Sequence, residues 1–596
     1  MVRAARMAAG GHPVTNRPLP GKSNTETTPS NKTNCHLQNR ENFTAAIKIL
    51  LRFMGQTDML RVMLRPSAFF LCFTLLCSCQ KESQVDKATR EGILLVGNSN
   101  EPKGLDPHIV SGVLEANILR ALFEGLVTND SQSDTATPPG AALEVTPDAN
   151  ATVWTAKLRP DGKWSDGMPI TAWDYAFSYQ RMLTPELGAK YSEMLYFLKG
   201  AEDFNRGITK DFSTVGVDVV DDITLRLTLR GPTPYFRQIL KHFTWTAVPR
   251  HIVLKHGKIG QRGNPWTRPE NIVGNGPYQM KSWRRNDHIE VERNPYYWDA
   301  KNVTLNGIRF LPITNLYTEG RMFRDGQLHT TYGATPEVVD LMKKEHPEQL
   351  RQEPYVGTFF YRCNTTRPYL ADPRVRQALS YALDREALCN NVFRGFTPAS
   401  AMTPAMGGYE PPQLARYDPE KARQLLAEAG FPNGKGLPRL KILIASRETA
   451  ATLAQAIQAM WRDTLGVEVE IENKEWNAYI IAMQELDYDI ASAAWIGDYL
   501  DPLTFLEMWM PGNGNNNTGW DNQVFASLLK QSFQDADSSH RFRLLYQAET
   551  ILLEEAPVLV IAGYARNYLM HPSVQGWHPL LLANNPYQYL RLVAGR

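Results

Sequence analysis

The stretch TVWTAKLRPDGKWSDGMPITAWDYAFSYQRML, residues 152–183, decides the fold more than any other part of this sequence. Its WTAKL segment alternates in the manner of a half-buried strand, and the PDG that follows is typical of a turn. Thr171 then precedes a helical pattern that carries Trp173, Phe177 and Met182. The stretch therefore predicts a strand, a turn and a capped helix in that order.

Residues 418–496 repeat this alternation of helices and strands. DPEKARQLLAEAGFPNG predicts a helix that ends at Gly430, and LPRLKILIAS predicts a buried strand. ATLAQAIQAMWRDTLG predicts a second helix, and VEVEIENKEWNAYI returns as a strand. The pattern indicates an α/β protein, and no fixed-period repeat or low-complexity linker interrupts it.

Composition narrows the class of protein. With 596 residues the chain is too long for one hydrophobic core, so several lobes are expected. A hydrophobic fraction of 43% and a charged fraction of 21% are those of a soluble globular protein. Lys and Arg number 64 against 62 Asp and Glu, without a long basic block, so no nucleic-acid partner is expected. The absence of a CxxC pair or a His/Cys cluster predicts no metal and no cofactor.

The segment MLRVMLRPSAFFLCFTLLCSCQKES, residues 59–83, has the charged, apolar and small-residue regions of a secretory signal. Its apolar run is shorter than the roughly 20 residues that a membrane-spanning helix needs. The ending LCSC resembles the lipobox of bacterial lipoproteins, which implies a signal peptide over residues 59–78 and a lipid on Cys79. The alternative is an ordinary signal peptide with an unmodified cysteine.

Residues 1–58 do not fit an exported protein, because a signal peptide is read near the start of a chain. We predict that they are not translated, with translation starting at Met59 or Met63, or that they are disordered. Residues 79–90 would form a charged, lipidated tether. In the folded body only Cys363 and Cys389 remain, either as a disulfide or as buried thiols.

Seven segments in order along the chain resemble the family 5 extracellular solute-binding proteins of ABC importers, especially the oligopeptide-binding proteins. They are EPKGLDPHIVSGVLEANILRALFEGLV, LRPDGKWSDGMPITAWDYAFSYQRML, NIVGNGPYQM, VERNPYYWD, DPRVRQALSYALDRE, AEAGFPNGKG and EAPVLVIAGY. In the second segment we expect Trp164, Trp173 and Tyr175 to pack a lobe rather than to contact a ligand.

The resemblance implies an α/β fold of the periplasmic-binding-protein type (class II), with two lobes, an extra α+β domain and a ligand cleft between the lobes. The ranges it implies are 84–123, 248–356 and 566–596 for lobe I, 124–247 for the extra domain and 357–565 for lobe II.

The resemblance also implies a site at the end of the segment ASAAWIGDYLDP. Asp498 stands where the oligopeptide receptors hold the peptide ammonium, with Trp495, Ile496 and Gly497 presenting an indole wall and backbone groups. Opposite charges in a poorly hydrated cleft bind strongly. The alternative for Asp498 is a cap or turn role, for which Asp501, directly before a proline, is the better candidate.

Further cleft residues follow from the resemblance. Val113 and Ser111 would face Asp498 from the first lobe, Trp476 would line a side-chain pocket, and Tyr191 would be a wall or a core residue. Related receptors can have Arg for the peptide carboxylate where this chain has Ser492 and Met483. Arg394 and Arg447 lie near other basic positions of the family and are candidates to replace them, so ligand length stays open.

The leading prediction is a lipid-anchored, monomeric binding protein of the periplasm or cell envelope, with no enzymatic activity. It would close its lobes on oligopeptides and deliver them to the permease and ATPase subunits of an ABC importer. Alternatives within the fold are receptors for dipeptides, murein peptides, nickel complexes or oligosaccharides, and a peptide sensor that does not transport. An exported peptidase or glycosidase is disfavoured, because the sequence has no G-x-S-x-G, no H-E-x-x-H and no S-x-x-K set with its companion motifs.

Overall fold

The computed structural model describes residues 82–445 and 448–594, apart from the side chains of residues 448, 449, 476 and 477. The predictions for residues 1–58, the signal peptide 59–78, lipidation of Cys79 and the role of Arg447 lie outside the described residues. The last residues of the predicted tether form most of helix α3 (Gln84–Glu91), whose Val85 and Ala88 are buried.

Most of the described strands belong to three sheets. A mixed sheet has the order β1-β8-β7-β6, and an antiparallel sheet has the order β2-β3-β5-β4. A six-stranded sheet has the order β10-β14-β9-β13-β11-β12. The bounds are β1 Ile93–Gly97, β2 Ala142–Pro147, β3 Val153–Leu158, β4 Val217–Asp221, β5 Thr224–Thr228, β6 Tyr278–Arg284, β7 His288–Arg293, β8 Gly307–Leu311, β9 Leu350–Cys363, β10 Thr397–Pro398, β11 Leu440–Ala445, β12 Val469–Lys474, β13 Ile490–Ile496, β14 Val558–Leu569, and the small pair β15 Val574–Gln575 and β16 Arg591–Leu592.

The helices lie between and after these strands along the chain. Their bounds are α4 Val113–Leu122, α5 Ala172–Leu183, α6 Ala201–Asn205, α7 Phe236–Ile239, α8 Arg250–His256, α9 Leu316–Arg324, α10 Pro336–Glu345, α11 Pro368–Ala371, α12 Pro373–Tyr381, α13 Arg385–Asn391, α14 Pro419–Glu428, α15 Glu448–Leu465, α16 Trp476–Gln484, α17 Leu503–Leu506, α18 Gln523–Ser532 and α19 Ser538–Glu555. Within the described residues no helix is both long and apolar enough to cross a bilayer.

The stretch 152–183 forms the predicted elements. WTAKL lies in β3, and α5 follows after the turn. Thr171 caps α5 in a capping box, in which the Asp174 carboxylate accepts the Thr171 backbone N–H at 2.9 Å. Trp164 and Tyr175 are fully buried, whereas Trp173 is 50% exposed, so only two of the three aromatic residues pack as expected.

Residues 418–496 form β/α units as predicted, with one difference. Helix α14, strand β11, helix α15 and strand β12 follow each other, and Gly430 adopts a φ of +94° behind α14. The expected strand in VEVEIENKEWNAYI ends at Lys474, and helix α16 starts at Trp476. The parallel pair of β11 and β12 stops there, so the chain leaves the sheet through a helix before it returns as β13.

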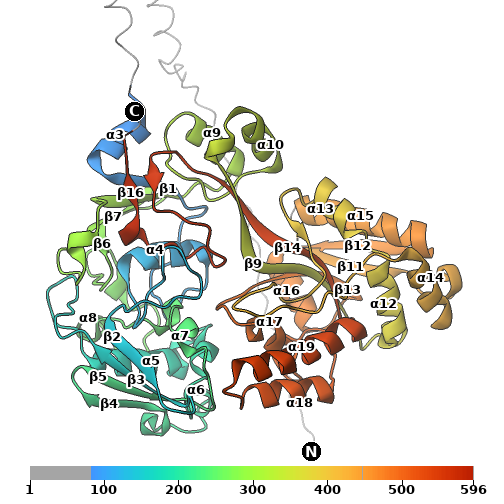
Figure 1. The fold of residues 1–596 in the computed structure, drawn as a ribbon, viewed down its shortest axis with the longest axis horizontal. Helices are drawn as coiled ribbons and strands as arrows, with labels where there is room; N and C mark the ends of the chain where they lie inside the picture. Colours follow the sequence, from blue (N-terminus) through green and yellow to red (C-terminus); the bar gives the residue numbers. More distant parts are fainter. Residues whose placement is uncertain (1–81, 446–447, 595–596) are drawn as a thin grey trace, which may run out of the picture. The chain divides into compact units, whose positions relative to one another are not determined.

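Strands β9 and β14 run between the two halves of Figure 1, from helices α9 and α10 to the six-stranded sheet. Their antiparallel pairing is irregular at two places, and the wider irregularity lies near the middle: Thr358 pairs with Gly563, but the next pair is Pro354 with Ala565. Tyr355 to Gly357 on β9 therefore oppose Tyr564 alone. Such an irregularity bends and twists a strand pair locally.

The hydrophobic cores differ between the sheets. The mixed sheet and the antiparallel sheet share one core, to which β1, β3, α5 and β6 all contribute. The six-stranded sheet has separate cores on its two faces, one with helices α12 and α15 and the other with α17, α18 and α19. The predicted lobe and extra-domain ranges remain predictions, since packing does not fix their limits.

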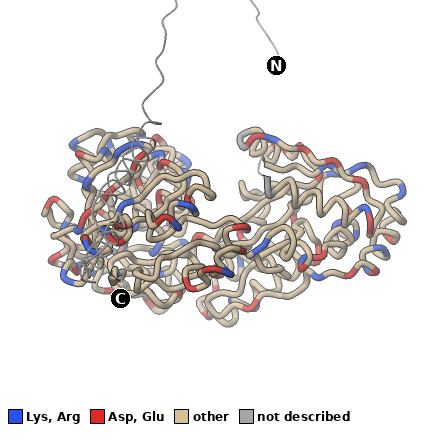
Figure 2. The backbone as a smooth tube through the Cα atoms, turned by 90° about the horizontal axis from the view of Figure 1, so that it is seen from above, with Lys and Arg blue, Asp and Glu red and all other residues tan. Residues whose placement is uncertain are grey.

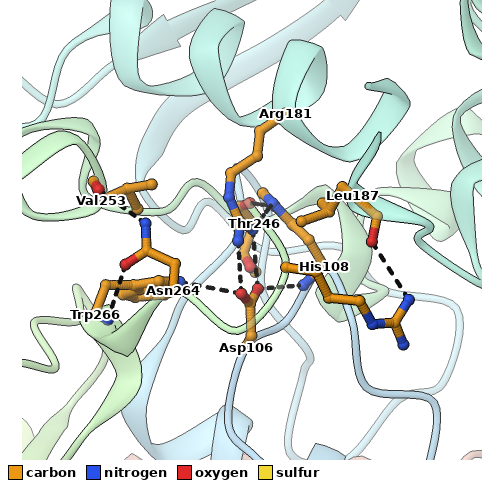
Figure 3. A network of polar contacts seen from close by, with 9 residues as sticks. Asp106, His108, Arg181, Leu187, Thr246, Val253, Asn264 and Trp266 are labelled. Carbon is orange, nitrogen blue, oxygen red and sulfur yellow. Dashed lines mark hydrogen bonds and ion pairs between the residues drawn. The ribbon is translucent and has the colours of Figure 1, made fainter. Parts of the chain in front are cut away.

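A buried ionic network supports the first of these cores (Figure 3). The guanidinium of Arg181 on α5 donates to both carboxylate oxygens of Asp106, at 3.0 and 2.6 Å, and the indole of Trp266 donates to the same carboxylate at 3.0 Å. His108 lies 3.0 Å from Arg181 and 3.4 Å from the carbonyl oxygen of Thr246. Although burial raises the pKa of Asp106, the charge of Arg181 holds it below its usual value.

Charges of both signs are interspersed along the described chain (Figure 2), in keeping with the near-zero net charge. Cys363 on β9 and Cys389 on α13 are both buried and free, so the structure has the thiols rather than the disulfide. Burial raises their pKa to about 12 and about 11. Thiols with such a pKa are poor nucleophiles.

Candidate functional site

A cavity with a volume of about 390 Å³ is lined by several distant parts of the chain. They include α4 with its flanking loops, the region around Tyr191 and His242, the end of β13 with Tyr355, and parts of the segment from Arg566 to Gln588. Seven of the predicted site residues line it: Ser111, Val113, Tyr191, Trp495, Ile496, Gly497 and Asp498. Val113 begins α4, and its side chain is 48% exposed.

Asp498 lies two residues after the end of β13, and its carboxylate forms no ion pair within the described part of the chain. The hydroxyl of Tyr191 donates to its Oδ1 at 3.4 Å, and its own N–H donates to the Thr504 hydroxyl. Burial, and secondarily the charge of Glu507, raise the pKa of Asp498 to about 7. A partly buried acid without a cationic partner is disposed to bind a cation.

Strand β13 offers unpaired backbone beside this acid. It pairs with β9 along its length, but with β11 only through Ile490 and Ala491. Gly497 N–H donates to the Val356 carbonyl at 2.8 Å, which fixes the alternation of hydrogen bonds along β13 and β9. The N–H and C=O groups of Ala494 and Ile496 therefore point away from β9. They lie on the edge of β13 that β11 no longer pairs with at this point.

Asp501 has the structural role for which the sequence favoured it. Its two carboxylate oxygens accept hydrogen bonds from Arg541 on α19 at 2.7 and 2.6 Å, and Oδ1 also accepts the N–H of Leu503 at 3.0 Å. Asp501 is 3% and Arg541 is 1% exposed. The Asp501 carboxylate is thus satisfied by hydrogen bonds within the protein.

Tyr191 and Trp495 form aromatic walls of the cavity. Tyr191 packs against the rings of His242 and Phe243 at centroid distances of 5.4 and 6.2 Å, so it is both a wall and a partner of the adjacent core. The indole nitrogen of Trp495 is buried and has no hydrogen-bond partner. A buried indole N–H without a partner is a donor that a ligand oxygen can satisfy.

Of the three other predicted residues, only Arg394 has a described side chain, and it is not at the cavity. Arg394 is bound by Asp340 at 2.6 Å and Glu337 at 3.5 Å, and it does not line the cavity. Trp476 begins α16, but its side chain is outside the described set, as is Arg447 altogether. Ser492 and Met483 are buried, and the guanidinium of Arg362 lies 4.0 Å from the Met483 sulfur.

The sequence interpretation missed the cations of the cavity. Arg120 on α4, Arg566 on β14 and Lys241 all line it, and burial lowers the pKa of Lys241 to about 8. For the two arginines the sequence contained a signal: Arg120 and Arg566 interrupt largely apolar segments, NILRALF and IAGYARNYL. The sequence pattern does not predict that α4 and β14 line the same cavity.

The six-stranded sheet, the mixed sheet with its companion antiparallel sheet, and a cavity lined from both sides define a two-lobed binding protein of the periplasmic type. The predicted fold class is confirmed by a crystal structure of the Haemophilus influenzae oligopeptide-binding protein OppA in complex with the peptide RPPGFSPFR. That structure has a TM-score of 0.72 and 30% identity, and covers 84% of this chain and 99% of its own.

Residues 136–517 match the family described as bacterial extracellular solute-binding proteins, family 5, and this chain belongs to that family. It is 34% identical over 495 residues to the periplasmic oligopeptide-binding protein OppA of Salmonella typhimurium, which covers 81% of this chain and 89% of that protein. It is 32% identical over 498 residues to the periplasmic murein peptide-binding protein MppA of Escherichia coli, with 82% and 90% covered. The resemblance read from the sequence is thereby confirmed.

Proposed function

We propose that this protein is the substrate-binding component of an ABC importer and that it captures peptides by their free N-terminus. The observation that carries the proposal is the Asp498 carboxylate, which faces the cavity without an ion pair at the end of an open strand edge. A peptide ammonium would pair with Asp498. The peptide backbone would add to β13 through Ala494 and Ile496, as in strand addition.

Family membership and the names of the relatives support the wider setting. A receptor of this kind works by closing on its ligand, and the irregular pairing between β9 and β14 at Tyr355–Gly357 is a suitable hinge. No bond of the ligand is made or broken in this scheme. The closed, loaded form would dock on a permease whose ATPase subunits drive import, and the receptor would act as a monomer.

The same proposal places the protein in the periplasm or cell envelope, held by a lipid on Cys79. Two or more acyl chains are needed for lasting attachment to a membrane. Mass spectrometry of the mature N-terminus tests this part. A chain that starts at a triacylated Cys79 is expected, and an unmodified residue at the N-terminus would refute the anchor.

Two measurements test the peptide proposal. Native mass spectrometry of the purified protein should show co-bound peptides, whose masses give their lengths. Isothermal titration should then show that Asp498→Asn weakens binding of a free-amine peptide far more than that of its N-acetylated form. The matched control is Asp218→Asn, which removes an exposed carboxylate on β4 outside the cavity. Equal losses for both peptides would show that Asp498 does not bind the ammonium.

Relatives named for murein peptides keep a second ligand class in view, and a cavity of about 390 Å³ is near the lower end of ligand sites. Short or branched peptides are therefore included among the ligands to test.

Among the described residues no group of three or more His, Cys, Asp and Glu side chains could hold a metal ion. Deletion of the gene should abolish uptake of a labelled peptide if the protein serves import, and should leave uptake unchanged if it serves only sensing.

A further inference from the structure

Two arginines that line the same cavity as Asp498 lack anionic partners among the described residues. Arg120 donates to the side-chain oxygens of Asn584 and Asn117, both neutral, and its Nε is buried without a partner. Arg566 packs beside the rings of Tyr568 and Tyr355, at 4.8 and 6.0 Å from their centroids. Its Nη1 is buried without a partner, and neither arginine forms an ion pair with a described residue.

The two cations are close enough to act on each other. Burial lowers the pKa of Arg120, and the charge of Arg566 lowers it further. Tyr355 lies within the electrostatic reach of Arg120, Arg566 and Asp498 together. A buried cation without an anion is costly, and two that repel each other cost more. One anion between them would relieve both costs.

The acids nearest to the two arginines do not form ion pairs with them. Glu353 is opposite Arg566 in the pairing of β9 and β14, but no ion pair joins the two side chains, and Oε2 of Glu353 is itself buried without a hydrogen-bond partner. Glu124 accepts hydrogen bonds from Tyr297 at 2.5 Å and Trp298 at 2.8 Å. Burial raises the pKa of Glu124 to about 7, so this acid is a weak counter-ion near neutral pH.

We propose that Arg120 and Arg566 form a subsite for a carboxylate of the bound ligand. Arg is well suited to this task, because its planar fork of donors matches a carboxylate. The inference deepens the proposed function and rests on it: one peptide would present its ammonium to Asp498 and a carboxylate to the arginine pair. That carboxylate is either an acidic side chain near the N-terminus or the C-terminal carboxylate of a short peptide.

Titrations with matched peptides test the subsite on the full-length mature protein. Glu-Ala-Ala-Ala against Gln-Ala-Ala-Ala, both amidated at the C-terminus, isolates the side-chain source. Ala-Ala against its C-terminal amide isolates the other. The wild type should favour one carboxylate-bearing member about tenfold or more, as expected for hydrogen bonds to a charged group. Arg566→Gln should abolish that preference, Arg566→Lys should keep part of it, and Arg226→Gln, an exposed arginine of β5, should leave it unchanged.

The outcomes separate the two proposals. Free-amine peptides that bind with no carboxylate preference, or with a preference that survives both Arg566→Gln and Arg120→Gln, would overturn the subsite alone. No binding of any free-amine peptide would overturn the proposed function and the subsite with it. Thermal unfolding of the ligand-free protein adds a second readout, because removal of an unpaired cation should leave the melting temperature of Arg566→Gln unchanged or higher. A marked fall would indicate that Arg566 is structural.

Discussion

Asp501 and Asp498 leave the same strand three residues apart, yet their surroundings differ completely. Asp501 is enclosed and bound at both oxygens by Arg541, whereas Asp498 faces the cavity and receives one long hydrogen bond from Tyr191. The arginines show the same contrast, since Arg541 is paired and Arg566 is not. Asp501 and Arg541 therefore neutralise each other inside the protein. Asp498 and Arg566 line the cavity and have no partner of opposite charge among the described residues.

The largest effect is expected from breaking the satisfied pair. Arg541→Met would leave the Asp501 carboxylate buried without its partner, so the free energy of unfolding should fall by about 3–5 kcal/mol. Urea denaturation followed by circular dichroism measures it. The double variant with Asp501→Asn should recover part of the loss, because the orphaned charge is then removed. A loss under about 1 kcal/mol would show that the pair matters little.

The second effect is a pH dependence of binding that belongs to Asp498. With its pKa raised to about 7 in the free protein, the acid is increasingly protonated as the pH falls below that value. An ammonium ligand binds the ionised form, so affinity should fall by up to about tenfold per pH unit below pH 7. Titration calorimetry from pH 5 to 7.5 measures the slope. The slope should vanish in Asp498→Asn, and its persistence there would assign it to another group such as Glu507.

A third and smaller effect concerns stability without ligand. Because folding raises the pKa of Asp498 to about 7, its ionised form costs stability, and this cost builds up as the pH rises from the unfolded-state pKa to about 7 and is constant above it. Asp498→Asn should therefore be about 1–2 kcal/mol more stable than the wild type at pH 8, after discounting for partial exposure. The two should be equally stable below the unfolded-state pKa of about 3.9. Asp501→Asn should instead destabilise the protein. The prediction is therefore tested by whether the two substitutions change the free energy of unfolding in opposite directions.

The smallest effect is expected at Arg394, where a charge pair lies on the surface. Its contacts with Asp340 and Glu337 are solvent-exposed, so Arg394→Gln should cost about 0–1 kcal/mol of stability. Peptide affinity should be unchanged, because Arg394 does not line the cavity. A loss of affinity confined to peptides with a free C-terminal carboxylate would restore Arg394 as the carboxylate partner.

Much of the fold could be predicted because local patterns and tertiary packing agree. The capping box at Thr171 and the stop at Gly430 are set by nearby residues, and both are present in the structure. Where a helix begins within a mixed pattern, local signals are weaker. Strand β12 therefore ends earlier than expected, and α3 replaces part of a tether, since Val85 and Ala88 find apolar partners only in the folded protein.

The site could be predicted only in part, for a reason of the same kind. Asp498 and Trp495 lie in one segment, and their proximity is read directly from the chain. Arg120 and Arg566 are more than 400 residues apart in sequence, and only the folded chain brings them to one cavity. Whether a charge is paired also depends on such contacts, so Arg394 was as plausible a carboxylate partner as Arg566 until the fold was known.

The open edge of β13 has one further consequence, which concerns what the protein avoids. An unpaired strand edge on a protein surface invites other edges to join it and promotes aggregation. Here Ile496 lines a cavity walled by Tyr191 and Trp495, and Ala494 precedes it along the same edge. An edge that runs into a cavity is less accessible to the edge of another sheet than one on an open surface. Under the proposed function, an extended peptide would cover this edge.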